Sequence, residues 1–251
     1  MTRLPEYSDF PAVARRSRWD ADAIDLTVDA EIWGQLEPGD AEPIAGLLAG
    51  FLLGERAVAD DIRPFRAQAP SDMIAACFAL QALDEERHRR FFERVHADVL
   101  GEDVDTALRR AIGRVPPAFT ALFEAELGNV AARLAEDAGA LVPAVALYHG
   151  LLEGVVFLAG QEELLARLAE PGLLPGVAEG VRRVQRDERW HVAFGARMLA
   201  DARAPLDADD FVAEGRRALD AWGPLVSREV GETTLAALRR RLRAAGMARA
   251  A

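Results

Sequence analysis

The sequence predicts an all-α protein built around a bundle of four long helices. Hydrophobic residues make up 51% of the chain and charged residues 28%, in long stretches rich in Ala, Leu, Arg and Glu that favour helices. No segment combines alternating apolar and polar residues with the turn residues that would indicate strands. Proline, glycine and N-cap residues interrupt the helical stretches, so the boundaries of the helices can be placed from the sequence.

The four long helices are expected at residues 41–66, 72–98, 140–169 and 177–203. Pro38 and Gly39 precede the first, Ser71 is an N-cap for the second, and Pro175 precedes the fourth. Further helices are expected before residue 38, between residues 101 and 137, and after residue 205. Residues 1–19 show no helical pattern, so we expect an irregular, basic N-terminal arm there. We expect residues 1–251 to form a single domain.

The overall charge and the cysteine content narrow the class of protein. The net charge of −11 argues against nucleic acid or an anionic membrane as a partner. Cys77 is the only cysteine, so an intrachain disulfide is excluded and a cytoplasmic protein is expected. The first ten residues lack the apolar core of a signal peptide.

One segment, residues 141–160, is apolar and long enough to span a membrane. It contains Pro143, His149 and Glu153, and the helical pattern continues beyond it. An ionisable residue in such a segment usually faces the interior of a bundle. We therefore expect a buried core helix and no membrane span.

Two Glu-x-x-His elements are the most informative motif. Each follows a lone glutamate in an apolar run, so one pattern occurs twice: Glu55 with Glu85 and His88, then Glu153 with Glu188 and His191. Residues three apart on a helix lie on one face, so each element offers a carboxylate and an imidazole to one point. Such helices supply the ligand set of the ferritin-like di-iron and di-manganese carboxylate proteins. The expected fold is therefore a ferritin-like four-helix bundle core with additional flanking helices.

The ligand types indicate which metals the predicted site would bind. An unpaired buried carboxylate is costly, so Glu55 and Glu153, which have apolar neighbours, are best explained by a metal that neutralises them. Histidine and carboxylate ligands suit iron or manganese, and a chain with one cysteine cannot hold an iron–sulfur cluster. Two metals that share six ligands keep open positions for O₂. Storage proteins use the same ligands, so the ligands alone do not define the chemistry.

Several other polar residues have a structural interpretation. Glu93 and His96 also have Glu-x-x-His spacing, but they lie about 12 Å along the helix axis from the first element, so we interpret them as a surface pair. His149 either faces the metals or packs between helices, and we favour packing. Asp84 and Asp187 each come directly before a ligand glutamate. Each is either a charge on the helix surface or a hydrogen-bond acceptor that fixes the tautomer of a histidine. Four acidic residues in polar stretches are expected to be solvated: Asp60, Asp61, Glu162 and Glu163.

Around these residues the sequence resembles the small-subunit-like proteins of class I ribonucleotide reductase. Within that superfamily it is most similar to the ligand-binding oxidases, which hold a manganese/iron centre. The resemblance covers roughly residues 40–200, and four segments carry it: GERAVADDIRPF, LDEERHRRFF, LYHGLLEGVVFLAGQ and RDERWHVAFG.

The resemblance implies roles for individual residues. It places Glu55, Glu85 and His88 on the first metal and Glu153, Glu188 and His191 on the second, with Glu85 as a bridge. It implies a Mn/Fe centre, with Fe/Fe as the alternative, a long-chain fatty acid or similar ligand in a channel between helices, and a homodimer.

The resemblance also implies a cross-link. In those oxidases a valine three residues after the first ligand glutamate becomes ether-linked to a tyrosine five residues before the third. Those offsets fall on Val58 and Tyr148. The alternative is a core valine and a buried tyrosine that is hydrogen-bonded to a carboxylate. By α-helical spacing Tyr148 lies about 140° around the helix from Glu153, so it would flank the site.

Some positions depart from the wider family. The radical tyrosine of reductase subunits is replaced by Phe92, and the C-terminus lacks the aromatic-bearing tail of those subunits. A partnership with a reductase large subunit is therefore not expected. Related arylamine oxygenases carry an extra histidine where this chain has Val184. Trp190, beside His191, is bulky and predicts a ligand channel of different shape.

We interpret the chain as a dinuclear metal oxidase that activates O₂ for a two-electron oxidation. One alternative is a di-iron oxygenase of a biosynthetic pathway that acts on another small molecule. The alternative that is not an enzyme is a helical bundle that stores or carries metal.

Overall fold

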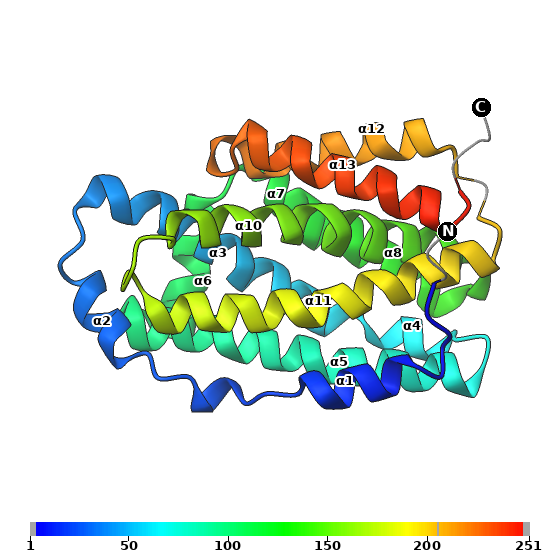
Figure 1. Cartoon of the computed structure of the whole chain (residues 1–251), viewed down its shortest axis with the longest axis horizontal. Coiled ribbons are helices and arrows are strands. Elements are labelled where there is room, and N and C mark those ends of the chain that lie inside the picture. The colour runs from blue at the N-terminus through cyan, green and yellow to red at the C-terminus, as the bar shows by residue number, and fades with distance from the viewer. Residues whose placement is uncertain (1–3, 205, 248–251) are drawn as a thin grey trace.

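The computed structural model describes residues 4–204 and 206–247, and all regular structure in these ranges is helical. The all-α prediction is confirmed. Figure 1 shows the long helices packed lengthwise against one another. They are α3 (Pro38–Asp61), α5 (Asp72–Arg94), α11 (Pro175–Asp201) and a continuous run made of α9 (Leu141–Val145), η5 (Ala146–Phe157) and α10 (Leu158–Arg167).

Shorter helices cover this bundle. In Figure 1, α1 runs along the side of α5 and α11, α2 lies at one end of these helices and contacts α11 and η2, and α12 and α13 lie over the run that contains α10. The shorter α-helices are α1 (Phe10–Ser17), α2 (Thr27–Trp33), α4 (Arg63–Ala67), α6 (Val104–Arg114), α7 (Pro117–Thr120), α8 (Gly128–Glu136), α12 (Ala208–Leu219) and α13 (Arg228–Ala244). Single turns and irregular helical segments complete the set: η1 (Ala21–Ala23), η2 (Val95–Val99), η3 (Ala121–Leu127), η4 (Ala138–Ala140) and η6 (Asp220–Leu225).

The prediction of an irregular N-terminal arm is wrong for residues 10–17, which form α1. Pro11 lies in the first turn, where a missing N–H costs nothing. Phe10 and Ala14, one turn apart, are buried against α5 and α11. A helix this short is marginal alone and depends on such packing.

Three helical segments are π-helices, which the sequence did not indicate: η2, η3 and η5. Hydrogen bonds from residue i to i+5 widen the turn, and such segments are frequent at functional sites. The widening corrects one prediction: residues five apart come close to the same face, so Tyr148 and Glu153 both face the bundle interior. α-Helical spacing would have placed them about 140° apart.

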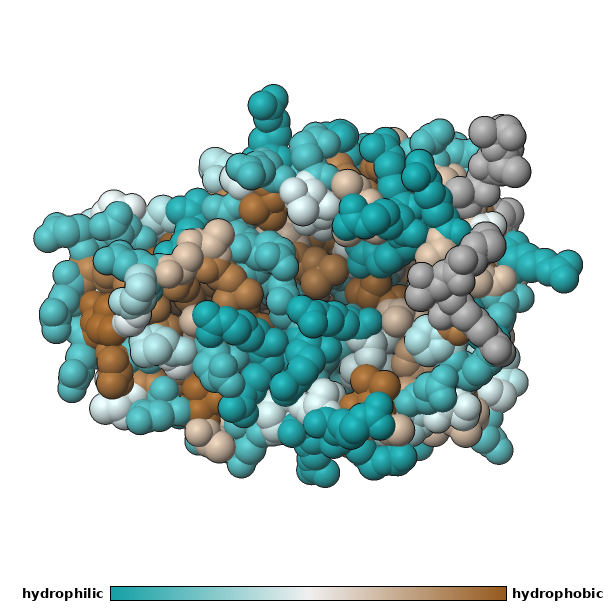
Figure 2. Space-filling model, viewed as in Figure 1, coloured by the Kyte–Doolittle hydropathy of each residue, from teal (hydrophilic) through white to brown (hydrophobic). Residues whose placement is uncertain are grey.

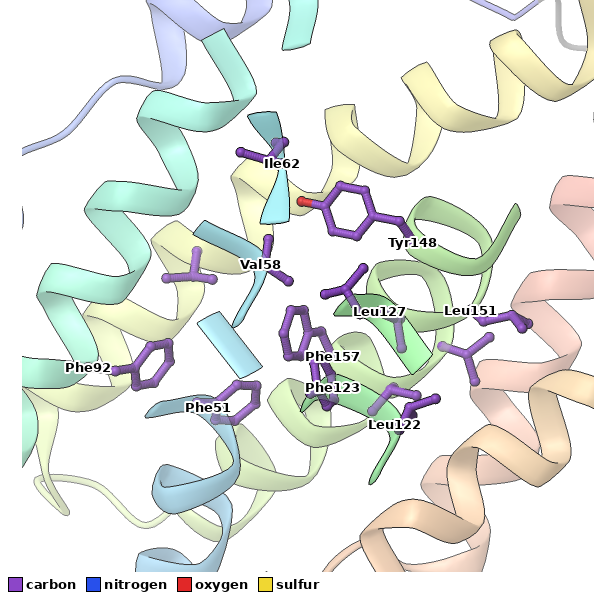
Figure 3. Close-up of a cluster of buried hydrophobic side chains, with 14 of the residues drawn as sticks. Phe51, Val58, Ile62, Phe92, Leu122, Phe123, Leu127, Tyr148, Leu151 and Phe157 are labelled. Atoms are coloured by element: carbon purple, nitrogen blue, oxygen red, sulfur yellow. The ribbon is translucent and has the colours of Figure 1, made fainter. Parts of the chain in front are cut away.

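Aromatic rings fill the bundle interior beside η5, and glycines make room for them (Figure 3). Phe51 and Phe92 stack with centroids 4.9 Å apart, and Phe123 and Phe157 stack at 5.1 Å. A Cβ added at Gly54 would lie 2.5 Å from the Phe157 ring. The close approach of α3 to η5 therefore depends on a glycine next to Glu55.

The face of the molecule in Figure 2 is mostly hydrophilic, and its hydrophilic side chains surround smaller hydrophobic patches. Within the described residues, one helical run, Ala138–Arg167, is long and apolar enough to cross a membrane, and 72% of its most apolar window is buried inside the protein. A buried core helix has these same properties, as the sequence predicted.

The start of α11 depends on Asp29, a fully buried residue of α2. Its carboxylate accepts hydrogen bonds from the backbone N–H groups of Gly176 (3.0 Å) and Val177 (2.7 Å). We expect Asp29→Ala to lower the free energy of unfolding by about 1–2 kcal/mol, because two buried donors lose their acceptor. Urea denaturation measures the change. The exposed Asp105→Ala should cost less than about 0.5 kcal/mol, and equal costs would contradict this role.

Candidate metal centre

The bundle brings the six predicted ligand side chains together in its interior. They come from α3, α5, η5 and α11, and each is 0% exposed: Glu55, Glu85, His88, Glu153, Glu188 and His191. They form two groups, and within each group the ligand atoms all lie within 4.8 Å of one another. The first contains Glu55, Glu85, His88 and Glu188, and the second contains Glu85, Glu153 and His191. The carboxylates and histidines are therefore positioned for a dinuclear site.

Two glutamates lie between the two histidines. Glu85 belongs to both groups, with its carboxylate oxygens 3.4 Å from Nδ1 of His88 and 3.2 Å from Nδ1 of His191. The oxygens of Glu188 lie 3.6 Å and 3.3 Å from the same two nitrogen atoms. The arrangement of Glu85 matches that expected of a bridging carboxylate. Glu188, which the sequence assigned to the second metal alone, faces both histidines.

The unsatisfied polar atoms of these residues fit a bound metal. Buried polar atoms normally have hydrogen-bond partners, so a cluster without them needs another explanation. Six such atoms converge here: both carboxylate oxygens of Glu55, one each of Glu85, Glu153 and Glu188, and Nδ1 of His88. Carboxylate oxygen and imidazole nitrogen are ligands that iron and manganese accept.

The electrostatics of the cluster also call for a cation. Burial raises the pKa of Glu188 well above its usual value, and the nearby Glu153 carboxylate adds to this shift. Burial raises the pKa of Glu153 to about 7. Burial also acts on Glu85, but His191 and His88 outweigh it and lower the pKa of Glu85 to about 2. Carboxylates buried this close together cannot all be ionised without a compensating positive charge.

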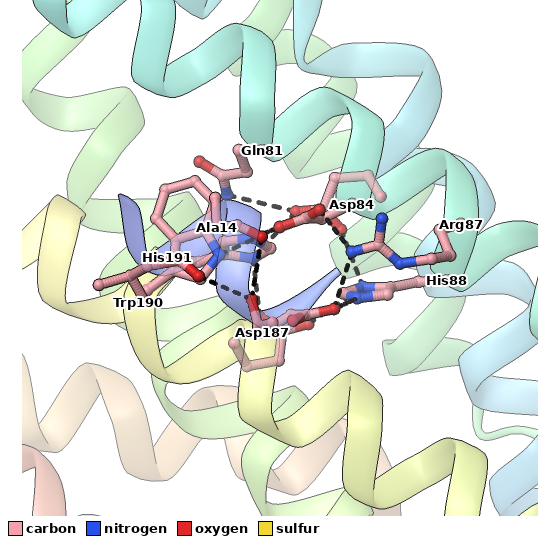
Figure 4. A network of polar contacts seen from close by, with 12 residues as sticks. Ala14, Gln81, Asp84, Arg87, His88, Asp187, Trp190 and His191 are labelled. Carbon is pink, nitrogen blue, oxygen red and sulfur yellow. Dashed lines mark hydrogen bonds and ion pairs between the residues drawn. The ribbon is translucent and has the colours of Figure 1, made fainter. Parts of the chain in front are cut away.

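Two aspartates hold the outer edges of the histidine rings (Figure 4). Asp187 Oδ2 lies 3.3 Å from Nε2 of His88, and Asp84 Oδ2 lies 3.3 Å from Nε2 of His191. An N–H at Nε2 that donates to the aspartate leaves the Nδ1 lone pair facing the carboxylates. Each aspartate therefore pairs with the histidine of the other sequence repeat, and neither is a surface charge.

The residues that donate hydrogen bonds to these two aspartates were not predicted from the sequence. The Trp19 indole N–H donates to Asp187 at 2.7 Å, and the Trp190 indole N–H donates to Asp84 at 3.0 Å. Arg87 donates to both aspartates, at 2.9 Å to Asp187. Trp190 bonds to Asp84 and packs on Phe10, 6.1 Å between ring centroids. The Trp19–Asp187 contact joins residues 168 positions apart, so no local pattern could have indicated it.

Tyr148 and His149 lie next to the ligand cluster. The Tyr148 hydroxyl donates to Glu85 Oε1 at 2.8 Å, and burial raises the pKa of this phenol, helped by the Glu153 and Glu85 carboxylates. His149 contacts Gln81 (3.0 Å) instead of a carboxylate. Its ring packs on Phe78 and on two more phenylalanines, as the favoured interpretation required.

The interpretation of Glu93 and His96 as a surface pair is wrong for His96. His96 lies in η2, is 0% exposed, and its Nδ1 lies 3.1 Å from Oε2 of Glu102. It is eleven residues after Glu85, about 20° around an α-helix, so it continues the buried face of α5. Glu93 pairs with Arg89 at 2.8 Å. The two residues thus have separate partners, and neither belongs to the two ligand groups.

One of the residues expected to be solvated is buried. Glu163 is 6% exposed and accepts a hydrogen bond from the Ser227 backbone N–H at 2.9 Å. Arg167, one turn later, lies 2.9 Å from the same carboxylate. Glu163 therefore holds α10 to the start of α13. Asp60 and Glu162 are exposed, as predicted, and Asp61 is partly buried.

Comparison with known proteins agrees with this fold. The family model of the ribonucleotide reductase small chain matches residues 2–214. An R2-like ligand-binding oxidase with an aerobically reconstituted Mn/Fe cofactor is 19% identical, with a TM-score of 0.78 over 98% of this chain and 94% of that chain. The R2-like ligand-binding oxidase from Sulfolobus acidocaldarius is 21% identical, with a TM-score of 0.78 over 97% and 90%. The predicted ferritin-like bundle is thereby confirmed.

Proposed function

We propose that this chain, which belongs to the ribonucleotide reductase small chain family, is a dinuclear metal oxidase that uses O₂ for a two-electron oxidation. The observation that carries the proposal is the pair of buried ligand groups that share Glu85, which together hold six buried side-chain atoms without a hydrogen-bond partner among the described residues. A Mn/Fe pair is favoured, because similar solved structures carry that cofactor, and Fe/Fe is the alternative.

The roles of the ligands follow from this proposal. Glu55, Glu85 and His88 would hold the first metal, and Glu153, Glu188 and His191 the second, with Glu85 between them. The bound metals would supply the redox chemistry for reducing O₂. The protein orients both imidazoles through Asp187 and Asp84 and surrounds the centre with buried side chains that exclude water.

The proposed ligand is a long-chain fatty acid or a similar apolar acid. A half-open pocket of about 800 Å³ lies between η3, η5 and α12, with a mostly apolar lining. Leu122 and Leu151 line this pocket and also belong to the hydrophobic cluster that contains Val58 and Tyr148 (Figure 3). Such a pocket has the size and character of small-molecule sites. We propose that an apolar chain reaches the metal centre from this side.

Radical delivery to a reductase large subunit is not part of the proposal. The position of the radical tyrosine is Phe92, which is fully buried and stacks on Phe51. Phenylalanine has no hydroxyl hydrogen to give up, so it cannot replace that tyrosine. We propose instead that the chain acts as a homodimer on its own small-molecule ligand.

Metal analysis of protein purified from its own host tests this function. We expect two metal ions per chain, one manganese and one iron, and mass spectrometry of the extracted ligand should find an apolar acid. If added iron loads far beyond two ions per chain, the interpretation as an oxidase is wrong and the protein is a storage protein. Two irons per chain without an apolar acid would favour the biosynthetic oxygenase.

A further inference from the structure

Gln81 is a fully buried residue of α5, one helical turn before Glu85, and it touches the centre without being a predicted ligand. Its Nε2 donates to Glu153 Oε1 at 2.7 Å and lies 3.1 Å from the Tyr148 hydroxyl oxygen and 3.2 Å from Glu85 Oε1. Its Oε1 lies 3.0 Å from Nε2 of His149. Figure 4 shows the Gln81 amide directed at the ligand cluster.

The orientation of this amide is determined by its surroundings. Ionised carboxylates only accept hydrogen bonds, so the NH₂ group of Gln81 must face Glu153 and Glu85. The carbonyl oxygen then faces His149, whose Nε2 must carry the hydrogen. Burial, helped by His191, lowers the pKa of His149 to about 3, which agrees with a neutral ring.

His149 is itself held firmly in place. A Cβ added at Gly195 would lie 2.2 Å from Cβ of His149, so α11 packs directly on this residue. The rings of Phe78 and Phe194 lie 5.9 Å and 5.7 Å from the imidazole. The His149 N–H therefore provides a fixed donor that keeps the Gln81 amide from rotating.

The consequence is an inequality between the two halves of the centre. Among the residues that the structure describes, Gln81 is the partner of one oxygen of Glu153 and leaves only Oε2 without a partner, whereas neither oxygen of Glu55 has one. The second repeat has no amide at the matching position, which is the buried, apolar Val184. The adjacent Gln185 donates to Glu162 at 2.7 Å instead. The half of the centre that contains Glu153 thus has a carboxylate with one free oxygen, and the half that contains Glu55 has a carboxylate with two.

We propose that Gln81, supported by His149, is a positioning residue that makes the two metal positions inequivalent by restricting Glu153 to one free oxygen. This inference rests on the proposed function, in which these carboxylates hold two metals. A centre with two unlike positions can discriminate between two metals, whereas the sequence repeat alone would give two like ones. Gln81 also accounts for the place of the Tyr148 hydroxyl, which lies between the amide and Glu85.

Anaerobic titration of metal-free protein with Mn(II), followed by the electron paramagnetic resonance signal of the free ion, tests the proposal. Wild-type protein should bind two ions with distinct affinities. Gln81→Met keeps the side-chain length but removes the amide, and it should weaken one of the two affinities by about 10–100-fold, because losing a partner that orients a ligand has effects of this size. The other affinity should stay within about twofold, because the amide does not contact Glu55 or His88. Its only contact with Glu85 is to Oε1, the oxygen next to His191, and Oε2 is the oxygen next to His88.

The matched control is Gln161→Met, since Gln161 is an equally buried glutamine on α10 whose side-chain atoms have no partner among the described residues. It should leave both affinities unchanged. Equal weakening of both affinities by Gln81→Met, no weakening, or tightening of one would overturn the proposal. Tightening would mean that the amide competes with the metal.

A second variant keeps the test decisive if Gln81→Met fails to fold. His149→Phe removes the N–H that fixes the amide, and it should weaken the same single affinity by a smaller factor. A change at both positions or at neither would again overturn the role of Gln81. The wild-type titration separates the two hypotheses: fewer than two bound ions would contradict the proposed function itself.

Discussion

Replacing Glu85 with alanine should abolish the binding of two metals per chain while leaving the helical fold intact. Glu85 belongs to both ligand groups and lies within 3.4 Å of Nδ1 of each histidine, so its loss removes a ligand from both positions. The fold should survive, because the packing of long amphipathic helices holds the bundle. Elemental analysis measures the metal content, and far-ultraviolet circular dichroism measures the helix content.

Glu93→Ala is the matched control for this variant. Glu93 lies on the same helix, eight residues after Glu85, and its carboxylate contacts Arg89 at 2.8 Å and Arg56 at 3.7 Å. Its loss should leave the metal content unchanged. A folded Glu85→Ala protein that still binds two metals tightly would refute the assignment of the bridging ligand. Loss of metal from Glu93→Ala would show that the wrong Glu-x-x-His element was chosen.

The long helices and the convergence of the six ligand residues could be predicted because the sequence determines both locally. The cap Ser71 marks the start of α5, as predicted. The predicted bounds of α3 are wrong, because the helix begins at Pro38 itself and ends at Asp61, and proline is well accommodated in the first turn of a helix. Three-residue spacing puts Glu85 and His88 on one helix face whatever else the chain does. Because the whole pattern occurs twice, the four helices must pack together for their ligands to share one site.

The surroundings of the ligands could not be predicted, because they depend on contacts between distant segments. Trp19 reaches Asp187 only after the N-terminal segment has packed along α5 and α11. Gln81 looks like an ordinary helix residue in the sequence, and only the fold brings Glu153 and His149 to its amide. The sequence did contain one indication: Gln81 lies one turn before the ligand Glu85, on the same helix face.

The π-helices are a second limit of prediction from the sequence. An apolar run such as residues 146–157 reads equally well as an α-helix, because packing selects the wider turn. That choice determines where Tyr148 points relative to Glu153.

Val58 and Tyr148 are the residues of the proposed cross-link. Val58 follows Glu55 by three residues, shares its helix face and is 1% exposed. In Figure 3 the Tyr148 side chain points toward the segment of α3 that carries Val58 and Ile62. Hydrogen loss from the valine Cβ leaves a tertiary radical that a phenol oxygen can trap. In the cross-link that we propose, an ether bond would form as one hydrogen leaves the Tyr148 hydroxyl and one leaves Val58 Cβ, and O₂ would accept these two electrons and two protons.

Aerobic metal loading should therefore join the Val58 and Tyr148 peptides, and the joined product should be lighter than their sum by two hydrogen atoms. Peptide mapping by mass spectrometry measures this. Protein loaded without oxygen should show separate peptides because it lacks the electron acceptor, and Tyr148→Phe should show them separate because it lacks the attacking oxygen. The buried hydroxyl already donates to Glu85, so a base for its proton lies 2.8 Å away. Separate peptides in fully loaded, oxygen-exposed wild-type protein would rule out the cross-link and shift the balance toward the biosynthetic oxygenase.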